Sequence, residues 1–242
     1  MHRLTDWQIY DLLNRDVARL WLFGADLSGG KLAEANLSQV NLGEANLSGA
    51  DLRRAVLTKA NLREANLIGA NLTQADLSEV ILTEAGLIGA KLTDAILTQA
   101  NLNGANLNEA RLERAYLNCA KINEANFIAA QLMEANLNGS ALHQANFVRA
   151  NCTDADFSET NLTQSSFVGA NLSGVNLSQA NLIGANLNQA NLSGVNLSDA
   201  NLSHANLYEA MLAGAVLGNA NFSGATMPDG VVMPVRQPTR GG

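Results

Sequence analysis

The residues of this chain that most often carry chemistry, histidine and cysteine, are few and scattered. The histidines are His2, His143 and His204, and the cysteines are Cys119 and Cys152. A metal site needs several such ligands in one place, and a catalytic nucleophile needs a base within hydrogen-bond reach. The sequence contains no nucleophile elbow, no Gly-rich phosphate loop and no HExxH. We therefore predict no catalytic, cofactor-binding or metal-binding residues, and no enzymatic activity.

Composition and charge exclude further classes of function. The 242 residues carry a formal net charge of −7, whereas nucleic-acid binders are normally basic. No apolar run is long enough to span a membrane, and the N-terminus, MHRLTDWQIYDLLNRD, lacks the apolar core of a signal peptide. Two cysteines fit a reducing compartment. We expect a cytoplasmic protein that binds neither nucleic acid directly nor a membrane.

A five-residue repeat runs without insertion from Ala25 to Asp229. Its first rows are ADLSG, GKLAE and ANLSQ, and we number the positions of each row one to five. Position one is mostly Ala, position two mostly Asn or Asp, and position three mostly Leu, while Ser, Thr, Asn and Gly dominate the last two. The unbroken period predicts one repeat domain over 25–229, between a lead-in over 1–24 and a tail over 230–242.

The period of five excludes an α-helix and favours extended chain. On a helix, successive leucines would be rotated by ~140° and would not share a face. In extended chain, residues two apart point the same way, which places Ala and Leu on one side and Asn on the other. Positions four and five must then turn the chain. Glycine at position five, as at Gly49 and Gly69, supplies the positive φ of a type II turn.

Rows of the form A(N/D)LXX resemble the pentapeptide-repeat family, and the resemblance covers residues 25–229. It implies an all-β solenoid, a right-handed quadrilateral β-helix with four pentapeptides per coil. The number of sides comes from the resemblance, because the period alone does not determine it. The array would form about ten coils, a rod ~50 Å long at ~4.8 Å per coil. Such arrays are abundant in cyanobacteria, and these near-perfect rows resemble the cyanobacterial members most.

Both ends of such a solenoid expose unpaired strands and require caps. Residues 5–8 fit a capping box, and the apolar residues between 9 and 20 follow helical spacing, so we expect a short N-terminal capping α-helix over 5–19. Residues 20–24 are expected to form a degenerate repeat. At the other end, Val231, Val232, Met233 and Val235 form a short apolar tail.

One outward column has bulky apolar residues at position four, where Ser, Thr and Asn prevail elsewhere. Residues one coil apart stack, and this column contains Ile68, Ile88, Ile128, Val148, Val168 and Tyr208. Directly beneath it, position three changes to Phe127, Phe147 and Phe167. We predict that the column is a surface for a protein partner or for self-association. The alternative is that β-branched residues merely suit a strand-like wall.

A second column, at position five, is acidic and contains Glu44, Glu64, Glu84 and Glu124. Like charges ~5 Å apart repel mildly in water, and Arg63 is an expected counter-charge. A solvated edge is favoured over a cation site or a partner site.

Two classes of function remain. The first, which we favour, is a non-enzymatic structural or protein-interaction rod with an unknown protein partner. The second is implied by the resemblance, because some family members mimic DNA, bind DNA gyrase and protect it from quinolones. A mimic needs dense negative charge, whereas this array mixes Lys and Arg into its first half and lacks the interrupting loops of those members.

Self-association is the remaining question about partners. The tail could fold back on its own last coil or meet a second copy end to end, as in some members of the family. The apolar column offers a rival, side-by-side dimer. A monomer whose tail simply caps the last coil is the third alternative.

Overall fold

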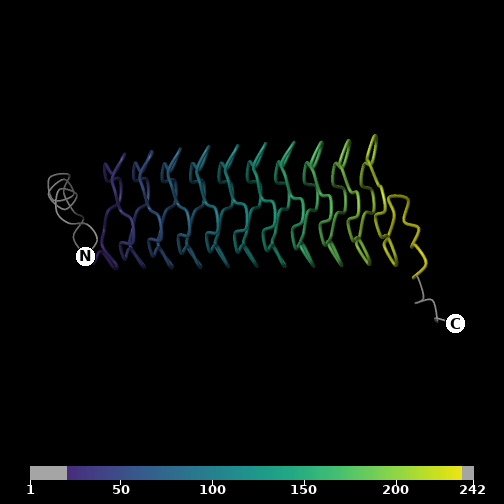
Figure 1. Ribbon diagram of the computed structural model, residues 1–242, viewed down its shortest axis with the longest axis horizontal. Helices are drawn as coiled ribbons and strands as arrows, with labels where there is room; N and C mark the ends of the chain where they lie inside the picture. Colours follow the sequence, from purple (N-terminus) through teal and green to yellow (C-terminus); the bar gives the residue numbers. More distant parts are fainter. Residues whose placement is uncertain (1–20, 236–242) are drawn as a thin grey trace.

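The computed structural model describes residues 21–235 of the chain. Over these residues the backbone winds into a stack of similar coils along one axis (Figure 1). Position-two residues pair in parallel with those 20 positions later, from Trp21–Asn41 to Asn206–Thr226. Each coil therefore contains four pentapeptides, and each pentapeptide forms one wall. Between residues 21 and 235 the chain forms no helix and no strand longer than these single paired residues.

Two of the sequence-based predictions concern the ends of the chain. The capping helix expected over 5–19 lies outside the described residues, as does the end of the tail. Residues 21–24 already follow the coil, because Trp21 pairs with Asn41 and Gly24 has a φ of 65° like later position-five residues. This agrees with a degenerate repeat at that point. No helix in the described part of the chain is long and apolar enough to cross a membrane.

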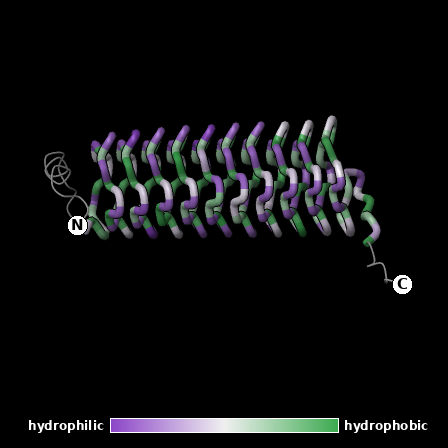
Figure 2. Tube along the Cα trace, in the orientation of Figure 1, coloured by the Kyte–Doolittle hydropathy of each residue, from purple (hydrophilic) through white to green (hydrophobic). Residues whose placement is uncertain are grey.

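Ala and Leu from positions one and three fill the interior. From Leu42 to Leu207, each position-three residue exposes at most 1% of its surface. Leu87, Leu107 and Leu187 are fully buried, as the register of the repeat predicted. Apolar and polar residues recur at the same places in successive coils (Figure 2). The small Ala side chains allow the walls to approach each other while Leu fills the space between them.

Backbone hydrogen bonds join the coils along the axis. The N–H of Leu27 donates to the carbonyl of Asn46 at 2.7 Å, and the N–H of Asn46 donates to the carbonyl of Ala25 at 2.9 Å. A third bond runs from the N–H of Gly29 to the carbonyl of Ser48, at 2.8 Å. The same pattern repeats around the coil, so strand edges are left open only at the ends of the stack.

Positions four and five form the turn between walls. The N–H of Ala45 donates to the carbonyl of Leu42 across one such turn, at 3.0 Å. Position five has a positive φ, as predicted for glycine, with 63° at Gly49. The same conformation is also adopted by many other residue types, for example Glu44 at 55° and Gln179 at 59°. A non-glycine residue there costs about 1–2 kcal/mol, which the turn and inter-coil bonds offset.

Asn at position two pairs the backbone N–H that the turn leaves free, that of position four. Asn191 Oδ1 accepts hydrogen bonds from the N–H of Ser193 at 3.1 Å and from its hydroxyl at 2.7 Å. Asn191 Nδ2 donates to Asn171 Oδ1 in the previous coil at 3.1 Å, so the amides form a ladder. Each such bond contributes a net ~0.5–1.5 kcal/mol, which explains why Asn and Asp dominate this position.

The C-terminal tail folds back on the last coil (Figure 1). Thr226 and Val232 form an antiparallel pair, and the N–H of Met233 donates to the carbonyl of Ala225 at 2.8 Å. Part of the core remains uncovered within the described residues, since Leu217 is 38% exposed while the equivalent leucines inside the stack are buried. Other exposed apolar residues gather there: Met211, Val216, Val231, Val232 and Val235.

Candidate interaction surface

The predicted column lies on one wall of the coil, built from pentapeptides 25–29, 45–49, 65–69 and their successors to 205–209. Ile68 and Tyr208 expose 46% and 43% of their surface. The other four members are half-buried: Ile88, Ile128, Val148 and Val168. The stacking of residues 20 apart brings these side chains into one row, which Asn108 and Asn188 interrupt.

Tyr208 lies apart from the rest of the row, at the C-terminal end. Its ring is beside Gly230 of the tail, where an added Cβ would meet the ring at 3.6 Å. The continuous part of the column is therefore the stretch from Ile68 to Val168. Tyr208 belongs equally to the apolar surface at the end of the rod.

The side chains beside the column are small and uncharged over much of its length. Position five in the same wall is Gly49, Gly69 and Gly89, and an added Cβ at any of them would meet no atom within 4 Å. Ile68 lies against Gly86, where an added Cβ would be 4.0 Å from Ile68 Cγ1. From Asn46 to Asn108 the outward residues of this wall include no ionisable group. The apolar side chains are therefore accessible to a closely approaching partner.

The core changes beneath the second half of the column. Phe127, Phe147 and Phe167 stack, with ring centroids 4.7 and 4.8 Å apart and planes within 6° and 4°. Phe157, from the opposite wall, meets Phe147 edge-on with centroids 5.6 Å apart. Such pairs add about 0.5–1.5 kcal/mol each beyond the burial of their area. Ile128, Val148 and Val168 therefore each come directly after one of these stacked Phe residues in the sequence.

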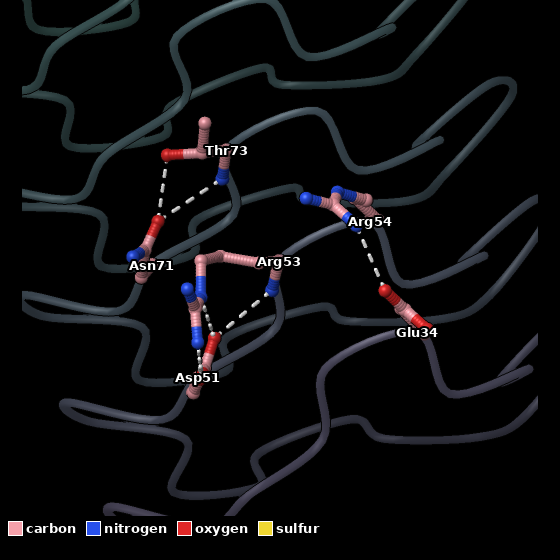
Figure 3. A network of polar contacts seen from close by, with 6 residues as sticks. All are labelled: Glu34, Asp51, Arg53, Arg54, Asn71 and Thr73. Atoms are coloured by element: carbon pink, nitrogen blue, oxygen red, sulfur yellow. Dashed lines mark hydrogen bonds and ion pairs between the residues drawn. The ribbon is translucent and has the colours of Figure 1, made fainter.

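The next wall along the chain is different, because it is charged and ion-paired (Figure 3). Arg53 Nη2 lies 2.6 Å from Asp51 Oδ2, and Arg54 Nη1 lies 2.9 Å from Glu34 Oε1 in the previous coil. The hydrogen bond from Arg53 holds the pKa of Asp51 below its usual value. Exposed pairs of this kind contribute only ~0–1 kcal/mol each, so they define the polarity of the wall more than its stability.

The acidic column receives the counter-charge that the sequence suggested. Arg63 Nε lies 2.9 Å from Glu64 Oε1, and Arg63 Nη2 lies 3.9 Å from Glu84 Oε2. Further along, Gly104 leaves a shallow hollow between Glu84 and Glu124. Residues 21–235 contain no group of three or more His, Cys, Asp or Glu side chains that could hold a metal ion.

The two histidines and the two cysteines of the array are not part of any such group within the described residues. His143 Nδ1 lies 2.7 Å from Thr163 Oγ1 of the next coil. Cys119 is exposed and Cys152 is buried, and both are free. Burial raises the pKa of the Cys152 thiol far above its usual value, so this thiol stays protonated.

The fold defines a class of protein, the four-sided parallel β-solenoid. Comparison with family models then assigns the chain, because the model described as pentapeptide repeats matches it in eight copies. The chain belongs to the pentapeptide-repeat family, whose members fold as right-handed quadrilateral β-helices. The predicted family and the predicted β-helix are thereby confirmed. The matched segments are 22–58, 60–99, 95–132, 110–148, 125–164, 150–189 and 190–227.

Several solved structures are similar to this chain. HetL from Nostoc sp. strain PCC 7120, which is involved in heterocyst differentiation regulation, is 35% identical over 86% of each chain, with a TM-score of 0.40. The protein alr5209 from Nostoc PCC 7120 is 34% identical over 38% of this chain and 77% of its own, with a TM-score of 0.34. QnrB1, a plasmid-mediated fluoroquinolone resistance protein, is 19% identical over 72% of this chain and 83% of its own, with a TM-score of 0.46. A comparison with curated protein sequences gives no match.

Proposed function

We propose that this protein is a non-enzymatic interaction rod of about ten coils, ~50 Å long, that binds another protein through one column of its surface. Residues 1–24 act as the N-terminal cap and lead-in, and residues 230–242 form the C-terminal tail. The binding column is the one defined above, namely Ile68, Ile88, Ile128, Val148, Val168 and Tyr208.

One contrast between neighbouring walls carries this proposal. The wall with the column presents apolar side chains beside glycines, with no ionisable group between Asn46 and Asn108. The next wall presents ion pairs such as Arg54 with Glu34 and Arg114 with Asp94. Depletion of charge together with apolar and aromatic residues is typical of the centre of a protein–protein interface. The stacked coils hold these side chains in fixed positions, so little conformational entropy is lost on binding.

The test is capture of a partner from lysate of the source cell. The double variant Ile88→Lys/Ile128→Lys places two charges in the column, and Thr98→Lys/Asn118→Lys places two charges at position four of another wall. We expect the first variant to lose proteins that the wild type captures, and the second to retain them. Equal capture by both variants would show that the column is not the binding surface.

The rival function, mimicry of DNA toward gyrase, has less support. A mimic must reproduce negative charge at about one per 1.7 Å of axis. Here arginines neutralise acids in the first half of the rod, as Arg114 does with Asp94 at 2.8 Å. From Asn151 to Asp229 the array has neither Lys nor Arg, but its acidic residues are widely spaced. We expect no effect in a supercoiling assay with purified gyrase and a quinolone, and protection of gyrase would reverse the preference.

Self-association is the partner interaction that this chain can be tested for alone. The apolar end at Leu217 and Met211 favours an end-to-end dimer, and the column favours a side-by-side dimer. An end-to-end dimer is longer than the monomer and a side-by-side dimer is thicker, and small-angle scattering distinguishes these two shapes. We propose the cytoplasm as the compartment, because the free thiols of Cys119 and Cys152 fit a reducing environment.

A further inference from the structure

The apolar column is close to symmetric about Asn108. One coil away on either side are Ile88 and Ile128, and two coils away are Ile68 and Val148. Residues of similar size and polarity thus lie at equal distances from Asn108. The third pair, Ser48 and Val168, departs from the symmetry. Tyr208 has no counterpart within the described residues.

We propose that two copies of this chain pair side by side and antiparallel through this column, about a two-fold axis at Asn108. The inference rests on the proposed function, since it names a second copy as the partner. Ile88 of one copy then lies opposite Ile128 of the other, and Ile68 lies opposite Val148. Two such rods have the same coil rise of ~4.8 Å, so their contacts stay in register along the whole column. A helical partner, with a pitch of ~5.4 Å, would fall out of register with the column. Two-fold contacts are also the commonest form of homo-oligomer.

Asn108 fixes the register of this pairing. Its Oδ1 accepts a hydrogen bond from the N–H of Ile128 at 3.0 Å, while its own N–H donates to Asn106 Oδ1 at 3.2 Å. Within the described residues, Asn108 Nδ2 has no hydrogen-bond partner. On the axis, the two Asn108 amides lie beside each other and can satisfy these donors. A register shifted by one or two coils would place Asn108 against Ile or Val, and a single Asn fixes the register of an apolar coiled-coil seam in the same way. A shift of four coils would pair Asn108 with Asn188 but would oppose the two copies of Arg149.

The charges of the wall favour antiparallel over parallel pairing. Its ionisable residues are Asp26, Glu109, Arg149 and Glu209. In a parallel pair each of the four would face its own copy, and like charges in direct opposition are destabilising. In the antiparallel pair Arg149 faces Gly69, and only Glu109 meets its own copy. Gly69 also leaves room for the Arg149 side chain, because no atom lies within 4 Å of an added Cβ there.

The size of the contact predicts a weak dimer. Six coil rises separate Ser48 from Val168, so the paired strip is ~30 Å long and ~10 Å wide, or ~600 Å² over both copies. Contacts below about 1,200 Å² are typical of weak and transient complexes. We therefore expect an equilibrium that dissociates on dilution.

Cross-linking through single cysteines tests the register directly. All variants carry Cys119→Ser, which removes the exposed thiol, and retain the buried Cys152. With the shortest bis-maleimide reagent, Asn108→Cys should form a covalent dimer at least tenfold faster than Ile68→Cys. Two copies of residue 68 lie ~19 Å apart in the antiparallel pair, which is four coil rises. A mixture of Ile68→Cys and Val148→Cys should cross-link as Asn108→Cys does.

The matched control is Asn103→Cys, because Asn103 Oδ1 accepts the N–H of Asn123 at 2.9 Å and so has the same role on another wall. It should not cross-link. Self-linking of Ile68→Cys as fast as Asn108→Cys would overturn the proposal in favour of parallel pairing. Failure of all variants to cross-link would overturn it as well, whether sedimentation then shows monomers or end-to-end dimers. The proposed function fails separately, if Ile88→Lys/Ile128→Lys leaves partner capture unchanged.

Discussion

At the residue scale, each of the first three positions of the pentapeptide has one structural role. Leu at position three fills the interior, and Ala at position one leaves the space that Leu needs. Asn at position two pairs the N–H of position four, as Asn191 does for Ser193. The repeat is near-perfect because all walls and all coils share these requirements.

Truncation of a core leucine should show how much each layer contributes. Leu107 is fully buried, so Leu107→Ala leaves a cavity and should lower the free energy of unfolding by about 2–5 kcal/mol. Gln99→Ala, at an exposed position five, should change it by no more than about 0.5 kcal/mol. Urea denaturation followed by circular dichroism measures both. Similar shifts for the two variants would mean that the leucines are not inside.

The two cysteines should differ sharply in reactivity. Cys119 is exposed, whereas Cys152 is buried with a raised thiol pKa, so little of its reactive thiolate is available. Iodoacetamide should therefore alkylate only Cys119 in the folded protein, and both residues in denaturant. Peptide mass spectrometry identifies the sites. Alkylation of Cys152 at the rate of Cys119 under native conditions would contradict its place in the core.

At the scale of the coil, most of the architecture could be predicted from the sequence. The inward and outward residues follow from the period, and Leu107 lies where that period placed it. The period does not encode the angle at each corner, so the four-sided coil had to come from the family resemblance. The left-handed turn at Glu44 could not be recognised from residue type, because the surrounding hydrogen bonds impose a conformation that glutamate alone disfavours.

Only part of the candidate surface could be predicted from the sequence. The bulky residues from Ile68 to Val168 stood out from the Ser and Thr of other position-four columns. The sequence could not predict that the tail folds back to pair Val232 with Thr226. An apolar tail can pack equally well on its own last coil or on a second copy. The asparagine ladder was missed, although Asn followed two residues later by Ser or Thr was its signal.

The asparagine ladder makes a graded prediction at this scale. Asn191→Ala removes the acceptor for the N–H of Ser193 and the donor to Asn171, and should destabilise by about 1–3 kcal/mol. Asn191→Asp retains the acceptor and loses only the donor, so its effect should be smaller. Denaturation midpoints of the two variants give the order. An aspartate variant as unstable as the alanine variant would show that the ladder, and not the turn, is the larger contribution.

At the scale of the whole molecule, the rod differs along its length and around its circumference. All the Lys and Arg of the array lie at or before Arg149, and the surface from Asn151 to Asp229 is mostly Asn, Ser, Gln and Gly. Along one edge the turns are hydrophilic for much of the rod and paler toward the C-terminal end (Figure 2). One wall carries the apolar column and few charges, while the next is ion-paired from Glu34 to Arg114. A solid rod with one distinct wall is suited to presenting a fixed row of contacts to another surface.

Small-angle scattering over a concentration series tests most directly whether the apolar column is the surface through which the protein associates. The wild type should thicken as concentration rises, with a larger cross-section and a length of only ~60 Å, because pairing about Asn108 offsets the two ~50 Å rods by about two coil rises. Ile88→Lys/Ile128→Lys should remain a single thin rod, and Thr98→Lys/Asn118→Lys should behave as the wild type. Growth to about twice the length, or thickening that the column variant shares, would contradict the account.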